Sequence, residues 1–283
     1  MWAPELCQRS ETVTVPDNRV VGPLPPDAMK ACCADAYSRD VVALLLGGSY
    51  HPGGISLTRR LADRLGLHPG RRILDVACGI GTTARILATE YDAQVDGIDL
   101  GEPTLTRART AAAGLADRVR FHHGDAESIP FPDNTFDTLV CECALCLFPD
   151  KARAAAEFAR VLRPGGRIGI TDVTIDESGL PAELTDLTAH VACIADARPA
   201  SAYIELLDTA GLRVMTAENH DWAVTTMLGH IEARLALLRT TAPEQLADTG
   251  LDRATTTRYL RSARQAVANG RLGYTMIVAE KSP

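Results

Sequence analysis

The spacing of apolar residues changes repeatedly between two periods along the middle of the chain. Compact apolar runs, typical of buried strands, occupy residues 72–77, 94–99, 118–123, 137–142 and 166–173. Segments with helical spacing separate them, near residues 82–90, 103–115 and 150–162. Strands that alternate with helices are typical of a parallel sheet with right-handed crossovers. The pattern therefore predicts an α/β fold.

The segments before and after this alternation are predicted to be mostly helical. Residues 1–28 are rich in proline and lack a sustained period, which favours a loosely docked leader. Apolar residues at helical spacing over 31–46 and 57–66 predict two helices before the first strand. The region after the fifth strand predicts a helical insert over 181–210, a strand over 212–218, helices over 222–239 and 252–268, and a last strand over 274–280.

We therefore expect two parts in the chain. Residues 1–68 would form the leader and an N-terminal helical cap. Residues 69–283 would form the core, with helical inserts near 176–210 and 222–269. The second insert would shape the substrate pocket or provide the contact of a homodimer.

A glycine turn, Gly79-Ile80-Gly81, follows the first predicted strand, and a helix-compatible segment comes directly after it. Glycine adopts backbone angles that a side chain forbids and lets a ligand approach the main chain closely. The spacing Gly79-x-Gly81-x-x-Ala84 fits the dinucleotide fingerprint, and Asp99 ends the second strand, where a ribose-binding carboxylate belongs. The turn predicts a nucleotide-like cofactor and leaves NAD possible.

The composition narrows the class of protein. With 283 residues, 46% of them apolar and 23% charged, the chain can bury a sizeable core, as an ordinary globular enzyme does. A formal net charge of −7 without any basic run argues against a nucleic-acid binder. The sequence has neither an apolar run long enough for a membrane span nor a signal-peptide pattern. We expect a cytoplasmic protein whose eight cysteines are reduced thiols.

Further motifs follow the glycine turn in a recognisable order. Gly124-Asp125-Ala126-Glu127 closes the third strand, and Arg160-Val161-Leu162-Arg163-Pro164-Gly165-Gly166 precedes the fifth. The run from Ile73 to Asp172 resembles the core of class I S-adenosylmethionine-dependent methyltransferases. The resemblance implies a Rossmann-like sheet of seven strands, mostly parallel, whose antiparallel last strand would be Tyr274 to Glu280.

The same resemblance implies S-adenosylmethionine as the cofactor and assigns residues to it. Gly79 and Gly81 would let the backbone pass close to the methionyl part, and Asp75 would help to hold its amino group. Asp99, followed by Leu100, would accept hydrogen bonds from the ribose hydroxyls. Asp125 and the Ala126 amide would contact the adenine.

Three cysteines lie at the end of the fourth strand, in Cys141-Glu142-Cys143-Ala144-Leu145-Cys146. Ligands of open parallel sheets bind beyond the carboxyl ends of the strands, which would place thiols beside the methyl group. Strand alternation predicts Cys141 and Cys143 on one face, with Glu142 on the other. We include Cys141 among the expected cofactor contacts.

A narrower resemblance concerns the methyl acceptor. The run Cys143-x-x-x-Leu147-x-Pro149-Asp150-Lys151 resembles the corresponding stretch of arsenite methyltransferases. By this resemblance, Cys193 would match the position of a second arsenic-binding cysteine of that family, and Cys32 or Cys33 would supply the third thiolate. Trivalent arsenic is soft and prefers sulfur ligands. The resemblance implies a methyltransferase in which these cysteines hold a metalloid substrate such as arsenite.

Other readings of the same residues stay open. Cys143-x-x-Cys146 could belong to a zinc site or a redox sensor. The enzyme could instead methylate oxygen, nitrogen or carbon of a small organic metabolite, with His51 or His190 as the base. A thiol module that no longer transfers methyl groups and an NAD dehydrogenase are the remaining alternatives.

Overall fold

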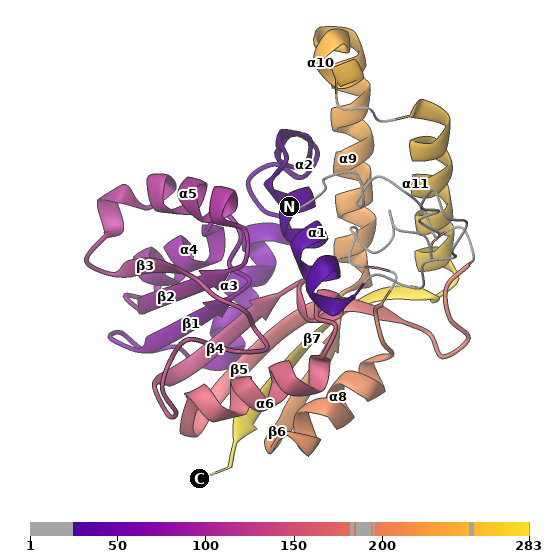
Figure 1. Ribbon diagram of the computed structural model, residues 1–283. Coiled ribbons are helices and arrows are strands. Elements are labelled where there is room, and N and C mark those ends of the chain that lie inside the picture. The colour runs from indigo at the N-terminus through magenta and orange to yellow at the C-terminus, as the bar shows by residue number, and fades with distance from the viewer. Residues whose placement is uncertain (1–24, 182–183, 185–193, 195, 249–251, 283) are drawn as a thin grey trace, which may run out of the picture.

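A computed structural model gives the fold of residues 25–181, 184, 194, 196–248 and 252–282. Its centre is a seven-stranded sheet with the order β3-β2-β1-β4-β5-β7-β6 (Figure 1). The strands are β1 (Arg72–Val76), β2 (Gln94–Asp99), β3 (Val119–His123), β4 (Phe136–Glu142), β5 (Leu162–Ile175), β6 (Leu212–Asn219) and β7 (Leu272–Lys281). Only β7 runs antiparallel to its neighbours, β5 and β6. The predicted seven-stranded, Rossmann-like α/β fold is confirmed.

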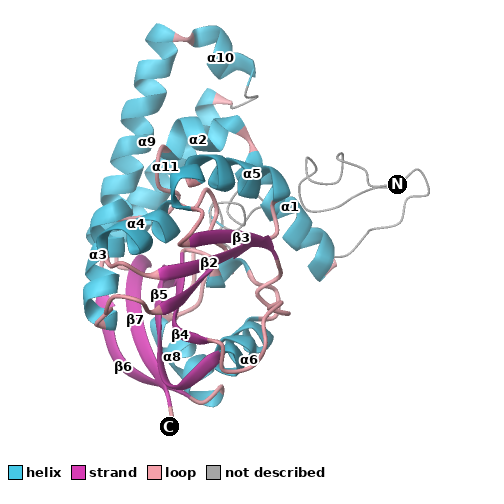
Figure 2. Cartoon of the chain, turned by 90° about the vertical axis from the view of Figure 1, so that its left-hand side faces the viewer, coloured by secondary structure: helices cyan, strands magenta, loops and turns pink. Residues whose placement is uncertain are grey.

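Helices cover both faces of the sheet (Figure 2). One apolar cluster joins the sheet to α3 (Gly54–Leu65), α4 (Thr82–Glu90), α5 (Glu102–Ala111), α9 (Asp221–Thr241) and α11 (Arg253–Ala268). A second cluster on the other face joins it to α6 (Lys151–Val161) and α8 (Ala200–Thr209). Short strand–helix turns thus bring the carboxyl ends of β1, β2 and β4 to a common edge of the sheet.

The N-terminal helices differ from the prediction. One helix was expected over 31–46, but α1 (Pro26–Ser38) and α2 (Asp40–Leu46) are separated at Arg39, whose backbone is extended. The break turns α2 onto α9, where Arg234 Nη1 donates a hydrogen bond to the Leu45 carbonyl at 2.8 Å. The apolar spacing continues across the break, so it does not reveal this change of direction.

Several other boundaries also differ from the sequence prediction. Residues 163–166, which were expected to precede the fifth strand, lie within β5 as a bulge, because the register between β4 and β5 shifts after Phe136 and Gly165 has a positive φ of 72°. α3 begins at Gly54, three residues before the predicted start at 57, and follows the left-handed backbone of Gly53. α10 (Pro243–Asp248) was not predicted. Of the insert expected over 181–210, α8 is a described helix, and most of the remainder lies outside the described residues.

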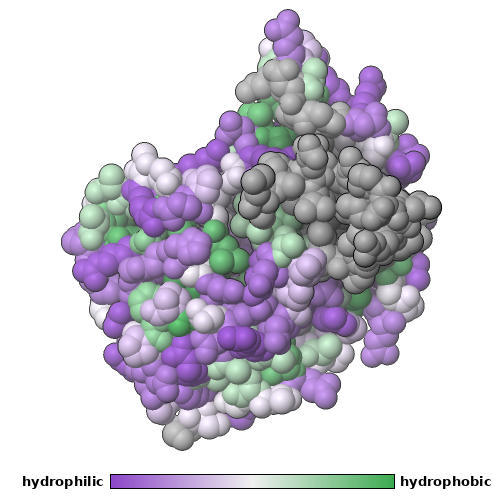
Figure 3. Space-filling model, viewed as in Figure 1, coloured by the Kyte–Doolittle hydropathy of each residue, from purple (hydrophilic) through white to green (hydrophobic). Residues whose placement is uncertain are grey.

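The exposed apolar side chains of the described residues do not gather in one large patch in the view of Figure 3. Figure 3 shows mostly hydrophilic residues with small, separate apolar areas on the described part of one face. The most exposed large apolar side chains are Ile55 on α3, Met215 on β6, and Trp222 and Leu237 near opposite ends of α9. Among the described helices, none is long and apolar enough to cross a bilayer.

Candidate active site

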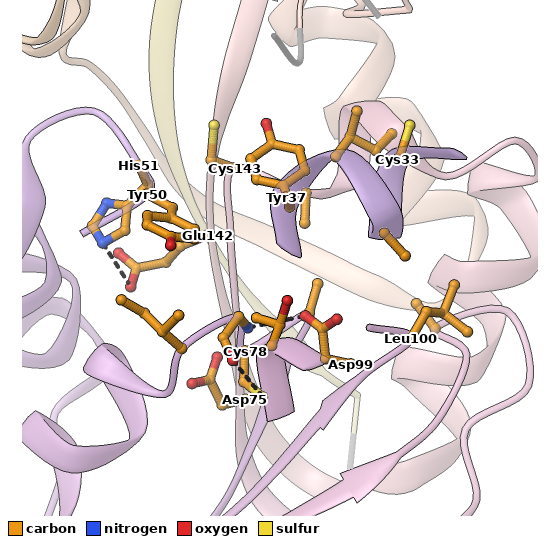
Figure 4. A pocket seen from close by; sticks show the side chains of 18 of the residues that line it. Cys33, Tyr37, Tyr50, His51, Asp75, Cys78, Asp99, Leu100, Glu142 and Cys143 are labelled. Carbon is orange, nitrogen blue, oxygen red and sulfur yellow. Dashed lines mark hydrogen bonds and ion pairs between the residues drawn. The ribbon is translucent and has the colours of Figure 1, made fainter. Parts of the chain in front are cut away.

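A cavity with about 1100 Å³ of empty space opens at the carboxyl ends of β1, β2 and β4. The strand ends supply Asp75, Asp99 and Glu142; Cys33 and Tyr37 of α1 lie across the cavity from Asp75 and Asp99, and the loop at 49–51 lies beside Glu142 (Figure 4). This is the crevice beside the point where the strand order reverses, between β1 and β4, at which open α/β sheets bind their ligands. Its lining combines apolar and aromatic side chains with a few polar groups, as small-molecule sites do.

The two glycines of the turn have different tasks. Gly79 lines the cavity with a left-handed backbone, φ 53°, and a Cβ placed there would meet no protein atom within 4 Å. A Cβ at Gly81, whose φ is 72°, would lie 2.4 Å from Cζ of Phe121. The absent side chain therefore leaves room for a ligand at Gly79, whereas at Gly81 it allows close packing at the start of α4. Of the two predicted cofactor contacts, only Gly79 lines the cavity.

Asp75 presents an unsatisfied acceptor to the cavity. Its side chain is 2% exposed, and Oδ2 has no hydrogen-bond partner in the described structure. Burial, and then the negative charge of Glu142, hold the pKa of the Asp75 carboxyl well above its usual range. A buried carboxylate oxygen without a partner is costly unless a ligand donates to it. Asp75 is therefore suited to a cationic donor.

Asp99 is held rigidly by the backbone around it. Oδ2 accepts a hydrogen bond from the Gly79 amide at 3.0 Å, and Oδ1 accepts one from the Gly101 amide at 2.8 Å. Burial raises the pKa of this carboxyl, and the two amides oppose that effect. Each oxygen keeps a further lone pair. Asp99 can thus accept hydrogen bonds from ligand hydroxyls, with Leu100 beside it in the cavity wall.

Asp125 and Ala126 line the cavity as predicted, but a lysine that the sequence did not single out also lies there. Lys30, on α1, donates to Asp125 Oδ2 at 2.8 Å and also binds Glu127. Asp125 Oδ1 accepts from the Glu127 amide at 2.9 Å. The ion pairs fasten α1 to the loop after β3.

Glu142 and His51 form a second polar group in the cavity. The Glu142 side chain, 4% exposed, accepts hydrogen bonds from Thr83 Oγ1 at 2.6 Å and from Thr58 Oγ1 at 3.1 Å. His51 Nε2 lies 3.5 Å from Glu142 Oε2, and Nδ1 lies 3.2 Å from the Pro52 carbonyl. Figure 4 shows His51, Tyr50 and Glu142 together on one side of the cavity. His51 was a candidate from the sequence, whereas Glu142 was missed.

The cysteines within the described residues do not share one site. Cys143 lines the cavity with a left-handed backbone, φ 56°, while Cys141 is fully buried in the core facing α6. The prediction that these two thiols share a face is wrong, because the chain leaves the strand geometry at Cys143. Cys141 does not line the cavity, and burial raises the pKa of its thiol well above the usual range. Cys146 is buried as well.

The other cysteines predicted as metalloid ligands also do not all line the cavity. Cys33 lines the cavity, whereas Cys32 is buried on the same helix, does not line the cavity and is disulfide-bonded. The expectation that all eight cysteines are reduced thiols, and with it the prediction of Cys32 as a thiolate ligand, is therefore wrong. In Figure 4, Tyr37 lies between Cys33 and Cys143. Cys193 and His190 lie outside the described residues. The described part of the chain contains no group of three or more His, Cys, Asp or Glu side chains able to hold a metal ion.

The chain is similar to known methyltransferases. Residues 73–166 match the family model of a methyltransferase domain. Over 131 residues, 45% of this chain and 48% of the relative, it is 41% identical to the 27-O-demethylrifamycin SV methyltransferase of Amycolatopsis mediterranei. Over 204 residues, 72% of this chain and 39% of the relative, it is 32% identical to the phosphoethanolamine N-methyltransferase of Triticum aestivum. The chain thus spans less than half the length of these curated relatives.

The fold is similar to that of a solved methyltransferase with its cofactor. Phosphoethanolamine N-methyltransferase 2 of Haemonchus contortus, in complex with S-adenosyl-L-methionine, superposes with a TM-score of 0.75 at 20% identity, covering 94% of this chain and 62% of that one. The strand order, the cavity at the glycine turn and the family match agree with one another. The chain therefore carries a class I S-adenosylmethionine-dependent methyltransferase domain, and S-adenosylmethionine is its cofactor.

Proposed function

We propose that the whole protein transfers a methyl group to the oxygen or nitrogen of a small organic acceptor, with His51 as the proton acceptor. The observation that carries the proposal is the pair of His51 and Glu142 in the cofactor cavity, 3.5 Å apart. The names of two relatives support it, because one is a 27-O-demethylrifamycin SV methyltransferase and the other a phosphoethanolamine N-methyltransferase.

The residues around the glycine turn fit the cofactor. S-adenosylmethionine supplies a methyl group on a positively charged sulfur, which keeps the bonding electron pair when the methyl group leaves. Asp75 Oδ2, buried and without a partner, suits the ammonium group, and Gly79 leaves room for the methionyl part. Asp99 and Leu100 would contact the ribose, and Asp125 with the Ala126 amide would contact the adenine. Asp75 and Glu142 together favour a cation at this end of the cavity.

His51 is arranged to take up a proton. In the tautomer that donates Nδ1–H to the Pro52 carbonyl, Nε2 carries the lone pair and lies 3.3 Å from Thr58 Oγ1 and 3.5 Å from Glu142 Oε2. When the acceptor oxygen bonds to the methyl carbon, its proton would pass to Nε2, and Glu142 would stabilise the resulting imidazolium. Thr58 and Thr83 hold Glu142 in place through their hydroxyls. General base catalysis of this kind contributes about 10²- to 10⁴-fold.

A metalloid acceptor is the second candidate, favoured by one observation. Cys33 and Cys143 line the same cavity, and two thiolates could hold a trivalent metalloid near the methyl donor. Cys193 would supply the third ligand, as the resemblance to arsenite methyltransferases implies. This candidate needs no base, because a metalloid lone pair attacks directly.

The N-terminal helices support the predicted division into a cap, residues 1–68, and a core, residues 69–283. α1 provides Lys30, Cys33 and Tyr37 to the cavity, and the loop after α2 provides Tyr50 and His51. A homodimer and a cytoplasmic location stay predictions.

One experiment separates the two acceptor classes. The purified protein is incubated with S-adenosylmethionine and, in separate reactions, with phenols, alcohols, amines or arsenite, and S-adenosylhomocysteine is measured. We expect turnover of an organic acceptor that Cys143→Ser retains and His51→Gln lowers by about 10²-fold or more. Turnover of arsenite alone, lost in Cys143→Ser and kept in His51→Gln, would replace the proposal by the second candidate.

A further inference from the structure

We propose that the methyl acceptor carries no phosphate or carboxylate group, so that the substrate is an uncharged or cationic molecule with an apolar body. The inference rests on the proposed function, because it concerns the acceptor of that same cavity. It is argued from the charges that line the cavity and from the side chains opposite the glycine turn.

Negative charge dominates the cavity wall. Four carboxylates line it, on Asp75, Asp99, Asp125 and Glu142. Asp75 and Glu142 lie at the ends of the adjacent strands β1 and β4 and have side chains 2% and 4% exposed, respectively. Water screens buried charges poorly, so an anion placed beside Glu142 would be repelled at close range; Asp75 adds to this repulsion only when its carboxyl is ionised and not paired with the ammonium group of the cofactor.

The lysine that could offset this repulsion already forms ion pairs with carboxylates of the protein. Lys30 is the one Lys or Arg among the cavity-lining residues of the described chain. Its side chain is 12% exposed and contacts both Asp125, at 2.8 Å, and Glu127. Burial alone would lower the pKa of Lys30, but the hydrogen bonds to these two carboxylates raise it, so the ammonium group stays charged and paired. Binding a phosphate would require breaking these ion pairs and leaving two carboxylates without a cation.

The stretches outside the described residues add little positive charge. Residues 182–195 contain no Lys or Arg, and residues 1–24 contain Arg9 and Arg19. The experiment below therefore uses the full chain, in which both arginines take part.

The side of the cavity that faces the glycine turn is apolar and aromatic. Cys33, Tyr37 and Cys143 belong to it, and Leu147 and Phe148 are further apolar residues of the cavity lining. Figure 4 shows Cys33, Tyr37 and Cys143 on the side away from Asp75 and Asp99. An apolar acceptor body packs well against such a wall, and its hydroxyl or amine would then point toward His51 and Glu142.

This substrate class differs from that of one set of relatives. Phosphoethanolamine, named in the wheat and Haemonchus proteins, carries a phosphate group. The cavity of this chain offers that group no free cation among its described residues. A shared fold at 20% identity with the nematode protein thus would not extend to the same acceptor.

The test uses matched pairs of probes. The full chain, saturated with S-adenosylhomocysteine, is titrated by calorimetry with phenol and phenyl phosphate, with benzyl alcohol and benzoate, and with ethanolamine and phosphoethanolamine. We expect uncharged or cationic members to bind, and each to bind at least tenfold more tightly than its anionic partner. An anionic member that binds as tightly as its partner, or the binding of no uncharged or cationic member, would overturn the inference.

Two variants of one residue show whether charge causes the discrimination. Glu142→Gln removes a carboxylate and should reduce the ratio of the two dissociation constants within each probe pair by about threefold or more. Glu142→Asp keeps the charge and should preserve that ratio. An unchanged ratio in Glu142→Gln would contradict the electrostatic explanation. Methyl transfer is measured in parallel: no transfer to any probe, with the discrimination intact, refutes the proposed function and leaves the binding inference standing.

Discussion

Replacing Asp75 by Asn should weaken S-adenosylmethionine binding by about 30- to 150-fold. Asp75 Oδ2 is buried and has no partner in the described structure, so the proposed contact with the ammonium group is charge-assisted and screened from water. Removing one partner of such a pair costs about 2–3 kcal/mol. At about 1.4 kcal/mol for each tenfold change in Kd, this cost gives the range stated. Asn keeps the shape of the side chain and removes only its charge.

The pH dependence provides a second readout of the same contact. Burial and the charge of Glu142 hold the pKa of Asp75 well above its usual range in the ligand-free protein. Below that raised pKa, binding a cation must release the carboxyl proton, so affinity should rise about tenfold for each pH unit and level off above it. The asparagine of the Asp75→Asn variant cannot titrate, so the affinity of this variant for S-adenosylmethionine should change little over the same pH range.

Calorimetric titration of S-adenosylmethionine at several pH values measures both effects. The exposed Asp117, which lies outside the cavity, provides the control for a lost negative charge, since Asp117→Asn should bind as the wild type does. An Asp75→Asn variant that binds within threefold of wild type, or that keeps the wild-type pH dependence, would refute the role given to this carboxylate. Thermal unfolding of each variant verifies that the fold is intact.

Three further predictions concern the turn, the cap and the buried acid. Gly81→Ala should lower Tm more than Gly79→Ala does, because both backbones are left-handed, with φ of 72° and 53°, but only the Cβ at Gly81 would also clash with Phe121. Gly79→Ala should weaken cofactor binding at least tenfold, and the reverse ranking of Tm would contradict the assignment. Lys30→Met should speed amide hydrogen exchange across α1 by tenfold or more, and the exposed Arg39→Met serves as the control. The unfolded chain releases the Asp75 proton at lower pH than the folded chain does, so the ligand-free protein should lose stability as pH rises from 3.8 through the raised folded pKa. Asp75→Asn should remove that loss in scanning calorimetry.

Local patterns in the sequence identify the sheet and much of the cofactor side. The strands alternate with helices in the expected order, and Asp75, Gly79, Asp99 and Asp125 all line one cavity. Each stands at the end of a strand or in the turn that follows, where parallel topology brings chain segments together. A periodic pattern is enough to place such residues.

The acceptor side depends on contacts between distant segments. Glu142 meets Thr58 across 84 positions of sequence, and Lys30 meets Asp125 across 95, so no local period signals either pair. Cys141 and Cys143 were assigned to one face because alternation was extended past the strand end, where a left-handed residue breaks it. Gly81 fits the fingerprint but packs against Phe121 instead of the cavity.

The most direct test of the proposed function follows the methyl group itself. S-adenosylmethionine with a deuterated methyl group is incubated with the full chain and a panel of uncharged phenols, alcohols and amines, and the products are identified by mass spectrometry. Wild-type protein should yield an acceptor labelled on oxygen or nitrogen, Cys143→Ser should do so as well, and His51→Gln should be at least 10²-fold slower. No labelled organic product from the wild type, or equal rates for wild type and His51→Gln, would contradict the proposed methyl transfer and the role of His51.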